Sequence, residues 1–235
     1  MDIAQKVFRH EFKYYLNALE YVALQKKIAS FLPLDSHSFD EEGYLISSLY
    51  FDGIHQHSLY DKNNGVLNRE KYRIRIYNGS DQKITLERKS KNGDFICKEN
   101  APLFKQEYEA ILNGHPEVLA DKEDVLLKDF YAALMYRNFQ PVVIVSYTRE
   151  PYVYEPGNVR ITFDKKLNAA VNTIDLFDEH MISQEVLLPE QVIMEVKFDH
   201  FLPDSIRQLL QPERMLRSAI SKYVLCREAT FQNFK

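Results

Sequence analysis

The sequence predicts an α+β fold in which an antiparallel β-sheet, closed as a barrel or tunnel, is flanked by helices. Three observations predict it: β-branched and aromatic residues recur with a period of two, tight-turn signals separate consecutive strands, and charged side chains collect on one strand face. The chain has 235 residues and shows no repeat, low-complexity tract or linker. We therefore expect a single domain over residues 1–235.

The period-two pattern places the strands first. We expect them at residues 7–15, 44–52, 69–78, 82–90, 95–99, 142–155, 158–166 and 191–199, with shorter strands between 167 and 188. Asn78-Gly79 separates two of these segments and is a strong hairpin signal, as are Asn92-Gly93 and Gly157-Asn158 for later pairs. Consecutive hairpins of this kind indicate an antiparallel meander.

Helical signals lie between the strands. Asn17 with Glu20 forms a capping-box pattern before a helix that continues to about residue 28. Residues 105–113 predict a helix that Gly114 ends, and residues 118–139 predict an amphipathic, mostly helical segment. A last helix is expected at about 212–228, with Pro212 in its first turn.

The composition of the chain narrows the range of functions that we expect for it. The net charge of −4 gives no reason to expect nucleic-acid binding, and no apolar run approaches the ~20 residues that cross a bilayer. The first residues lack the apolar core of a signal peptide. Cys97 and Cys226 match no metal-binding spacing, so we expect free thiols and a cytoplasmic protein.

The charged residues are distributed unevenly over the expected strand faces. Side chains two positions apart point to the same side of a sheet. The shared face carries Arg9, Lys13, Lys71, Arg73, Arg75, Lys89, Arg149, Arg160 and Lys197, against the acids Glu11, Glu87, Asp164 and Glu195. A solvated outer face is the usual interpretation for a single strand. The excess of cations in an acidic chain instead favours binding of a polyanion, such as a string of phosphates.

Eight short motifs appear in an order that resembles a known family. They are Arg9-x-Glu11-x-Lys13-Tyr14, Ser48-Leu49-Tyr50-Phe51-Asp52, Lys71-Tyr72-Arg73-Ile74-Arg75, Leu86-Glu87-Arg88-Lys89, Tyr147-x-Arg149-x-x-Tyr152, Arg160-Ile161-Thr162-Phe163-Asp164, Glu195-Val196-Lys197 and Ser221-Lys222-Tyr223. From about Val7 to Tyr223 the chain resembles the VTC domain, the polyphosphate polymerase module of the CYTH-like triphosphate tunnel superfamily. Hydrolases of that superfamily carry Glu-x-Glu-x-Lys, and Arg9 replaces the first glutamate here, which favours the polymerase-like branch.

The resemblance implies roles for individual residues. The cations Arg73, Arg75, Arg149, Arg160 and Lys222 would act on the transferred phosphoryl group, while Lys13, Lys71, Lys89, Lys98, Tyr147, Lys197 and Ser221 would bind substrate. Glu195 matches the family's metal-binding glutamate, and Glu11 and Glu87 are weaker metal candidates that could equally pair with neighbouring cations. The cofactor would be Mn²⁺ or Mg²⁺, because such ions bridge phosphate oxygens and take one or two carboxylates.

The resemblance predicts a polyphosphate polymerase that moves the γ-phosphoryl group of ATP onto a growing polyphosphate chain. Positioning and charge neutralisation would suffice, without a protein nucleophile. Two alternatives stay open on the sequence: a metal-dependent hydrolase of triphosphate or short polyphosphate, and a non-catalytic polyphosphate-binding module. The expected partners are ATP and inorganic polyphosphate, with neither a nucleic acid nor a membrane segment.

Overall fold

The computed structural model describes residues 10–35, 38, 42–53, 68–92 and 95–232. Arg9, the start of the first expected strand and the expected turn at Gly93 lie outside the described residues. The chain forms two compact units. Unit 1 comprises Met1–Leu45, Tyr147–Asn168 and Glu185–Lys222, and unit 2 comprises Ile46–Ser146, Ala169–Gln184 and Tyr223–Lys235.

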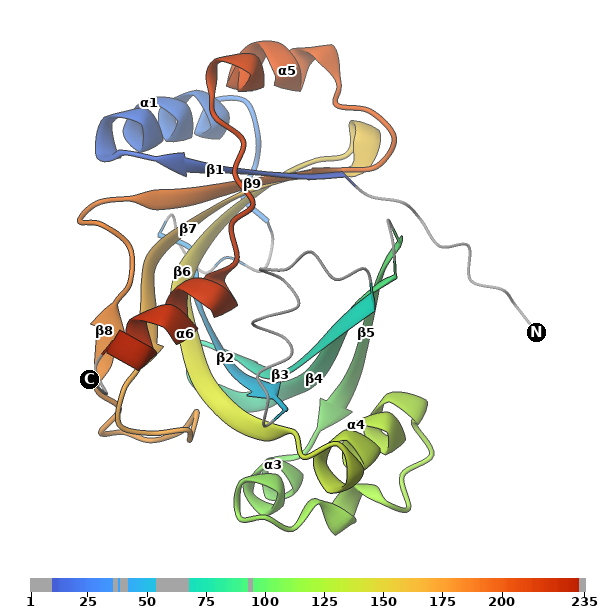
Figure 1. The fold of residues 1–235 in the computed structure, drawn as a ribbon. Helices are drawn as coiled ribbons and strands as arrows, with labels where there is room; N and C mark the ends of the chain where they lie inside the picture. The colour runs from blue at the N-terminus through green and yellow to red at the C-terminus, as the bar shows by residue number, and fades with distance from the viewer. Residues whose placement is uncertain (1–9, 36–37, 39–41, 54–67, 93–94, 233–235) are drawn as a thin grey trace. The chain divides into compact units, whose positions relative to one another are not determined.

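The strands belong to one 9-stranded sheet with the order β1-β9-β7-β6-β2-β3-β4-β5, and β8 pairs with β7 (Figure 1). Their bounds are β1 His10–Leu16, β2 Tyr44–Asp52, β3 Asn68–Tyr77, β4 Ser80–Asn92, β5 Phe95–Leu103, β6 Gln140–Tyr154, β7 Val159–Ala170, β8 Ser183–Glu185 and β9 Val192–Phe198. The antiparallel sheet with flanking helices is confirmed. Among the described strands the sheet does not close into a barrel, because β1 and β5 end the order without pairing with each other.

The register in unit 1 sorts side chains into a polar and an apolar face. Across β1, β9 and β7, Glu11 lies opposite Lys197, which lies opposite Arg160. The next row on the same face is formed by Lys13, Glu195 and Thr162. The residues between them on these strands point to the other face and form the unit's apolar core, which includes Tyr14, Ile161, Phe163, Met194 and Val196.

The register in unit 2 follows the same rule. Across β3, β4 and β5, Lys71 lies opposite Lys89 and Lys89 opposite Lys98, while Arg73 lies opposite Glu87. The intervening side chains pack on the other face into the core of this unit, which includes Tyr72, Ile74, Leu86, Ala101 and Phe130. The Asn78-Gly79 hairpin is confirmed, because both residues have the positive φ (51° and 67°) that its turn requires.

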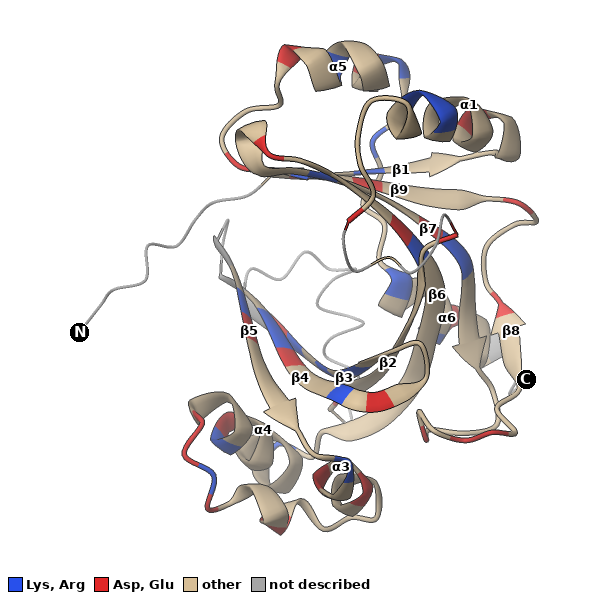
Figure 2. Ribbon diagram, turned by 180° about the vertical axis from the view of Figure 1, so that it is seen from behind, with Lys and Arg blue, Asp and Glu red and all other residues tan. Residues whose placement is uncertain are grey.

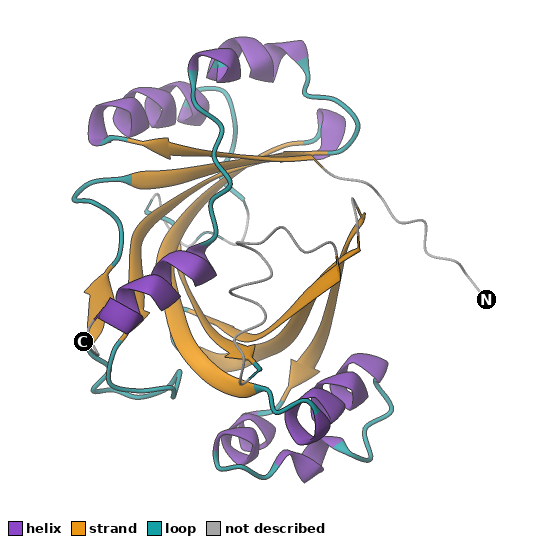
Figure 3. Cartoon of the chain, in the orientation of Figure 1, coloured by secondary structure: helices purple, strands orange, loops and turns teal. Residues whose placement is uncertain are grey.

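Helices flank the strands, as Figure 3 shows in purple. Their bounds are α1 Ala18–Ala29, α3 Lys105–Leu112, α4 Val125–Tyr136, α5 Asp204–Leu210 and α6 Lys222–Gln232, with 3-10 turns at Pro116–Leu119, Pro156–Asn158 and Pro212–Arg214. The capping box at Asn17 and Glu20 is confirmed, with two hydrogen bonds of 2.9 Å. No helix among the described residues is long and apolar enough to cross a membrane.

Two helix predictions were wrong in their bounds. The 118–139 segment divides into a 3-10 turn and α4, which starts where Asp124 accepts from the backbone of Leu126 and Leu127. The last helix starts at Lys222 instead of near Pro212. After a short 3-10 turn the chain runs alongside β1. Arg217 forms an isolated antiparallel β-bridge with Tyr14, and the Ser218 amide donates a hydrogen bond to the Lys13 carbonyl. That backbone pairing competes successfully with helix formation.

Candidate functional site

The residues expected to act on substrate or metal divide between the two units. Unit 1 holds Glu11, Lys13, Tyr147, Arg149, Arg160, Glu195, Lys197, Ser221 and Lys222, and unit 2 holds Lys71, Arg73, Arg75, Glu87, Lys89 and Lys98. Figure 2 shows lysine, arginine, aspartate and glutamate on the strands of the sheet.

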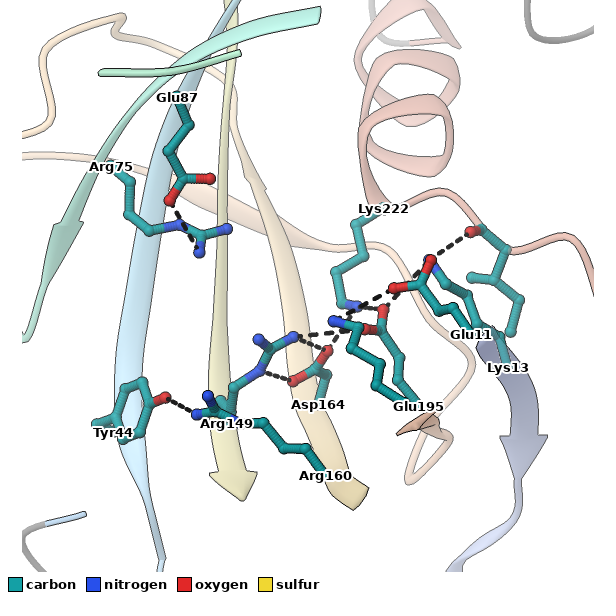
Figure 4. Close-up of polar contacts among 12 residues, drawn as sticks. Glu11, Lys13, Tyr44, Arg75, Glu87, Arg149, Arg160, Asp164, Glu195 and Lys222 are labelled. Atoms are coloured by element: carbon teal, nitrogen blue, oxygen red, sulfur yellow. Dashed lines mark hydrogen bonds and ion pairs between the residues drawn. The ribbon is translucent and has the colours of Figure 1, made fainter. Parts of the chain in front are cut away.

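In unit 1, seven charged side chains form one continuous set of ion pairs, and Figure 4 labels all of them except Lys197. We refer to this set as the Glu195 network, and its members are Glu11, Lys13, Arg149, Asp164, Glu195, Lys197 and Lys222. Opposite charges alternate along it. The network therefore neutralises most of its own charge, and its cations are positioned before any ligand arrives.

Glu195 is the centre of this network. One oxygen, Oε1, lies 2.8 Å from the Lys222 ammonium nitrogen and 3.3 Å from that of Lys13. The other, Oε2, lies 3.0 Å from Lys197 Nζ and 3.8 Å from Arg149 Nη2. Both oxygens therefore have cationic partners. A single cation that leaves Glu195 for a ligand does not leave the carboxylate uncompensated.

Asp164 is the second buried acid, and its side chain has no exposed surface. Its two oxygens accept from Arg149 Nε and Nη2, both at 2.7 Å, and Oδ2 also lies 2.5 Å from Lys222 Nζ. A bidentate pair of this kind fixes the guanidinium plane. Asp164 thus orients two cations that the sequence assigned to the phosphoryl group, and it leaves the Nη1 of Arg149 for a ligand.

Ionisation in the network follows from these contacts. Burial alone would raise the pKa of Asp164, but Arg149 and Lys222 outweigh it and hold that pKa below its ordinary value. Burial acts on Glu195 in the same way, and Lys222, Lys197 and Lys13 hold its pKa well below the ordinary value. Burial would lower the pKa of Lys222, yet the two carboxylates raise it. All three groups are therefore charged at neutral pH.

Arg160 belongs to the same face but has different partners. Its Nη2 lies 2.8 Å from Asp35 Oδ2 and 3.2 Å from the hydroxyl of Tyr44. Tyr147 lies beneath two cations of the network, with its ring centroid 4.9 Å from Lys222 Nζ and 5.3 Å from the Arg149 guanidinium carbon. Ser221 immediately precedes Lys222 and is half-buried.

In unit 2 the most informative feature is a row of three lysines. Lys71, Lys89 and Lys98 lie directly opposite one another on three neighbouring strands. This register brings three positively charged residues into one row across the sheet. Lys71 also lies over the Tyr223 ring, 4.4 Å from its centroid. We refer to these three residues as the lysine row.

Two arginines lie beside the lysine row and share one acid. Arg73 donates to Glu87 Oε2 and to the hydroxyl of Tyr50, at 2.8 Å, while Arg75 Nη1 lies 3.3 Å from Glu87 Oε1. Arg75 also donates to Ser48. Burial would raise the pKa of Glu87, but the two arginines hold it below the ordinary value. Glu87 therefore compensates part of the charge of both guanidinium groups.

The three expected metal ligands fit a divalent ion only in part. In the described residues no group of three or more histidine, cysteine or acidic side chains could hold a metal by itself. Glu11 and Glu195 do lie close, because Lys13 and Lys197 each contact both. Mg²⁺-type ions take one or two carboxylates and complete their shell with water and phosphate oxygens. Glu195 with Glu11 therefore fits an ion that arrives with a phosphate ligand. Glu87, in unit 2, forms ion pairs with Arg73 and Arg75.

Sequence reasoning did not assign a site role to four residues that contact the predicted ones: Asp35, Tyr44, Tyr50 and Asp164. Asp164 had a usable signal, since it shares a strand face with Arg160. No sequence signal pointed to Asp35, because it lies after α1 in a stretch without regular structure. Only the folded chain brings it next to Arg160. The two tyrosines resemble sheet-core residues, yet the hydroxyl group of each accepts a hydrogen bond from an arginine, and Arg73 also lies 5.7 Å from the centroid of the Tyr50 ring.

Comparison with known proteins identifies relatives of the chain and of its fold. The family model of the VTC domain matches residues 8–231. A "putative adenylate cyclase" from Bacillus halodurans has a similar structure, with a TM-score of 0.51 and 14% identity over 90% of this chain and 92% of that one. A conserved hypothetical protein from Pyrococcus furiosus gives a TM-score of 0.45 and 11% identity, over 89% and 95%. No curated protein matches the sequence.

Proposed function

Because this chain belongs to the VTC domain family, we propose that it is a metal-dependent polyphosphate polymerase, which transfers the γ-phosphoryl group of ATP onto inorganic polyphosphate. The family and the fold support a protein that binds nucleotides or other triphosphates. The transferase activity, ATP and the metal are our proposal.

The observation that carries the proposal is the lysine row. Three lysines at directly opposed positions on adjacent strands concentrate positive charge in one row, and a chain of phosphates presents negative charges at regular spacing. The neighbouring Arg73 and Arg75 have planar guanidinium groups, whose paired N–H donors match the geometry of nonbridging phosphate oxygens. The face of unit 2 is thus suited to a linear polyanion.

The Glu195 network of unit 1 is suited to the reacting phosphoryl group. Arg149 Nη1 and the Lys222 ammonium are donors whose orientation is fixed by Asp164. Preorganised donors of this kind stabilise charge that develops in a transition state without reorganisation. Glu195 and Glu11 would hold Mn²⁺ or Mg²⁺, which neutralises charge on the phosphate oxygens when bound. The residues of the chain would position donor and acceptor phosphates in line.

The test is product analysis with purified protein, ATP and Mn²⁺. Products are separated on a gel stained for polyphosphate, and orthophosphate is measured in parallel. A ladder of phosphate chains together with ADP is expected. Orthophosphate without chains would make the protein a hydrolase instead. Binding of polyphosphate without turnover would make it a binding module.

A matched pair of variants distinguishes the charged face from general damage. Arg73→Ala removes a guanidinium beside the lysine row. Arg88→Ala removes one from the opposite face of β4, where Arg88 binds Glu99 and Asp129 at 2.7–2.9 Å. A hydrogen bond to a charged group contributes about 1.5–3 kcal/mol, or roughly 10- to 150-fold in kcat/KM. We expect that loss for Arg73→Ala only, with Arg88→Ala affecting the melting temperature. Equal loss of activity in both variants would contradict the proposal.

A further inference from the structure

Two hydrogen-bond donors on β7 are buried without a partner in the described structure. The Thr162 side-chain hydroxyl and Arg160 Nε both have less than 1 Å² of exposed surface and no hydrogen bond. Thr162 as a whole is 1% exposed. Buried polar groups nearly always have partners, so two such groups on one strand call for an explanation.

The two groups lie in the site already described. They are two residues apart and point to the same face of β7, as does Asp164 of the Glu195 network. Thr162 lies opposite Glu195, and Arg160 opposite Lys197. Lys13 completes the row that contains Thr162. A ligand that reached both donors would therefore lie beside Lys13, Glu195 and Lys197 of this network.

The chemistry of the two groups restricts the ligand. Arg160 Nε can only donate, and a threonine hydroxyl can donate or accept. A ligand that satisfies both must therefore present acceptors, and the neighbouring cations favour anionic ones. Phosphate oxygens meet both requirements, and adjacent oxygens of a phosphate chain can serve two donors.

We propose that Thr162 is a further substrate-contacting residue, whose hydroxyl donates a hydrogen bond to a phosphate oxygen of the bound triphosphate or polyphosphate, beside Arg160. This proposal rests on the proposed function for the nature of the ligand. The hydroxyl is covered in the free protein, so ligand entry has to move at least one side chain that covers it. Without a ligand, the unsatisfied hydroxyl only costs stability.

The hydroxyl should therefore lower the stability of the free protein but strengthen ligand binding, and one substitution can test both effects. Thr162→Val keeps the shape of the side chain and removes the unsatisfied group. We expect the melting temperature of the free protein to be unchanged or higher. Affinity for tripolyphosphate, measured by calorimetry without nucleotide, should fall about tenfold or more, because hydrogen bonds to charged groups are the strong ones. Thr148→Val makes the same chemical change one residue before Arg149, on the other face of β6, and should leave affinity unchanged.

A second pair of variants covers the case in which the valine variant does not fold. Thr162→Ser and Thr162→Ala differ only in the hydroxyl, so serine should bind tripolyphosphate more tightly than alanine by a similar factor. Equal affinity of these two, or wild-type affinity of Thr162→Val, would overturn the role of Thr162. Absence of tripolyphosphate binding by the wild type would overturn the proposed function, and this inference with it. Hydroxyl-dependent binding without chain growth would uphold Thr162 and reject the polymerase activity alone.

Discussion

Arg149 and Asp164 are joined by two parallel hydrogen bonds of 2.7 Å, between a guanidinium on β6 and a fully buried carboxylate on β7. The same carboxylate holds Lys222. Two cations that come from distant parts of the sequence therefore share this acid, and both also contact Glu195. The orientation of both depends on Asp164, although the sequence pattern gave it no such role.

Asp164→Asn should destabilise the protein strongly, because it leaves Arg149 and Lys222 buried with one partner fewer. Removing one member of a buried ion pair costs about 3–5 kcal/mol. Urea unfolding monitored by circular dichroism measures this loss. Asp81→Asn is the matched control, since Asp81 and Lys105 form a largely exposed pair at 3.5 Å. That control should change stability by less than about 1 kcal/mol. Similar small losses in both variants would show that the buried pair contributes little.

Stability should decline in acid through the same carboxylates. The pKa values of Asp164 and Glu195 lie below their ordinary values of 3.8 and 4.5 in the folded protein. Their contribution is complete above those ordinary values and is lost as pH falls toward the folded-state pKa. The free energy of unfolding should therefore be steady from about pH 7 to about pH 5 and fall below about pH 4.5. Unfolding curves across this range should show a shallower decline for Asp164→Asn, and an identical decline would contradict the assignment.

Strand alternation predicted much of the candidate site. It correctly indicated that Arg160 shares a face with Asp164, and Glu195 with Lys197. The register between strands could not be predicted from the local sequence pattern, because the three lysines become neighbours only when β3, β4 and β5 pair. A shift by one residue would turn Lys89 to the other face. The sequence could therefore predict that cations gather on one face, but not which of them are neighbours.

The C-terminal region shows a second limit of local signals. Pro212 at the first position of a helix is a valid start signal, and a 3-10 turn does begin there. The chain then pairs along β1, through the Ser218 amide and the Lys13 carbonyl. Lys13 Nζ also donates to the Ile220 carbonyl at 3.3 Å. These contacts join residues about 200 positions apart, so no window of sequence around Pro212 contains them.

Gly43→Ala should disturb the position of Arg149. Gly43 has a φ of +97°, and a Cβ there would lie 2.0 Å from the Arg149 carbonyl oxygen. Gly79→Ala is the matched control, because Gly79 also has a positive φ (+67°) but no atom within 4 Å of the added Cβ. Backbone strain of about 1–2 kcal/mol is common to both. Gly43→Ala should cost more in thermal unfolding and also weaken tripolyphosphate binding. Equal losses in the two variants would mean that the backbone beside Arg149 yields readily.

Removal of divalent metal should stop product formation without destabilising the free protein. Each oxygen of Glu195 already has cationic partners, with Lys222 2.8 Å from Oε1 and Lys197 3.0 Å from Oε2. The carboxylate therefore needs no metal for charge compensation, unlike a structural site whose binding free energy is folding free energy. We expect an unchanged melting temperature in EDTA, together with loss of polyphosphate synthesis that added Mn²⁺ restores. A melting temperature that falls in EDTA and recovers with Mn²⁺ would instead show that a metal supports the fold. Glu195→Gln should abolish the rescue by Mn²⁺, because an amide is a weaker ligand for a hard cation than a carboxylate.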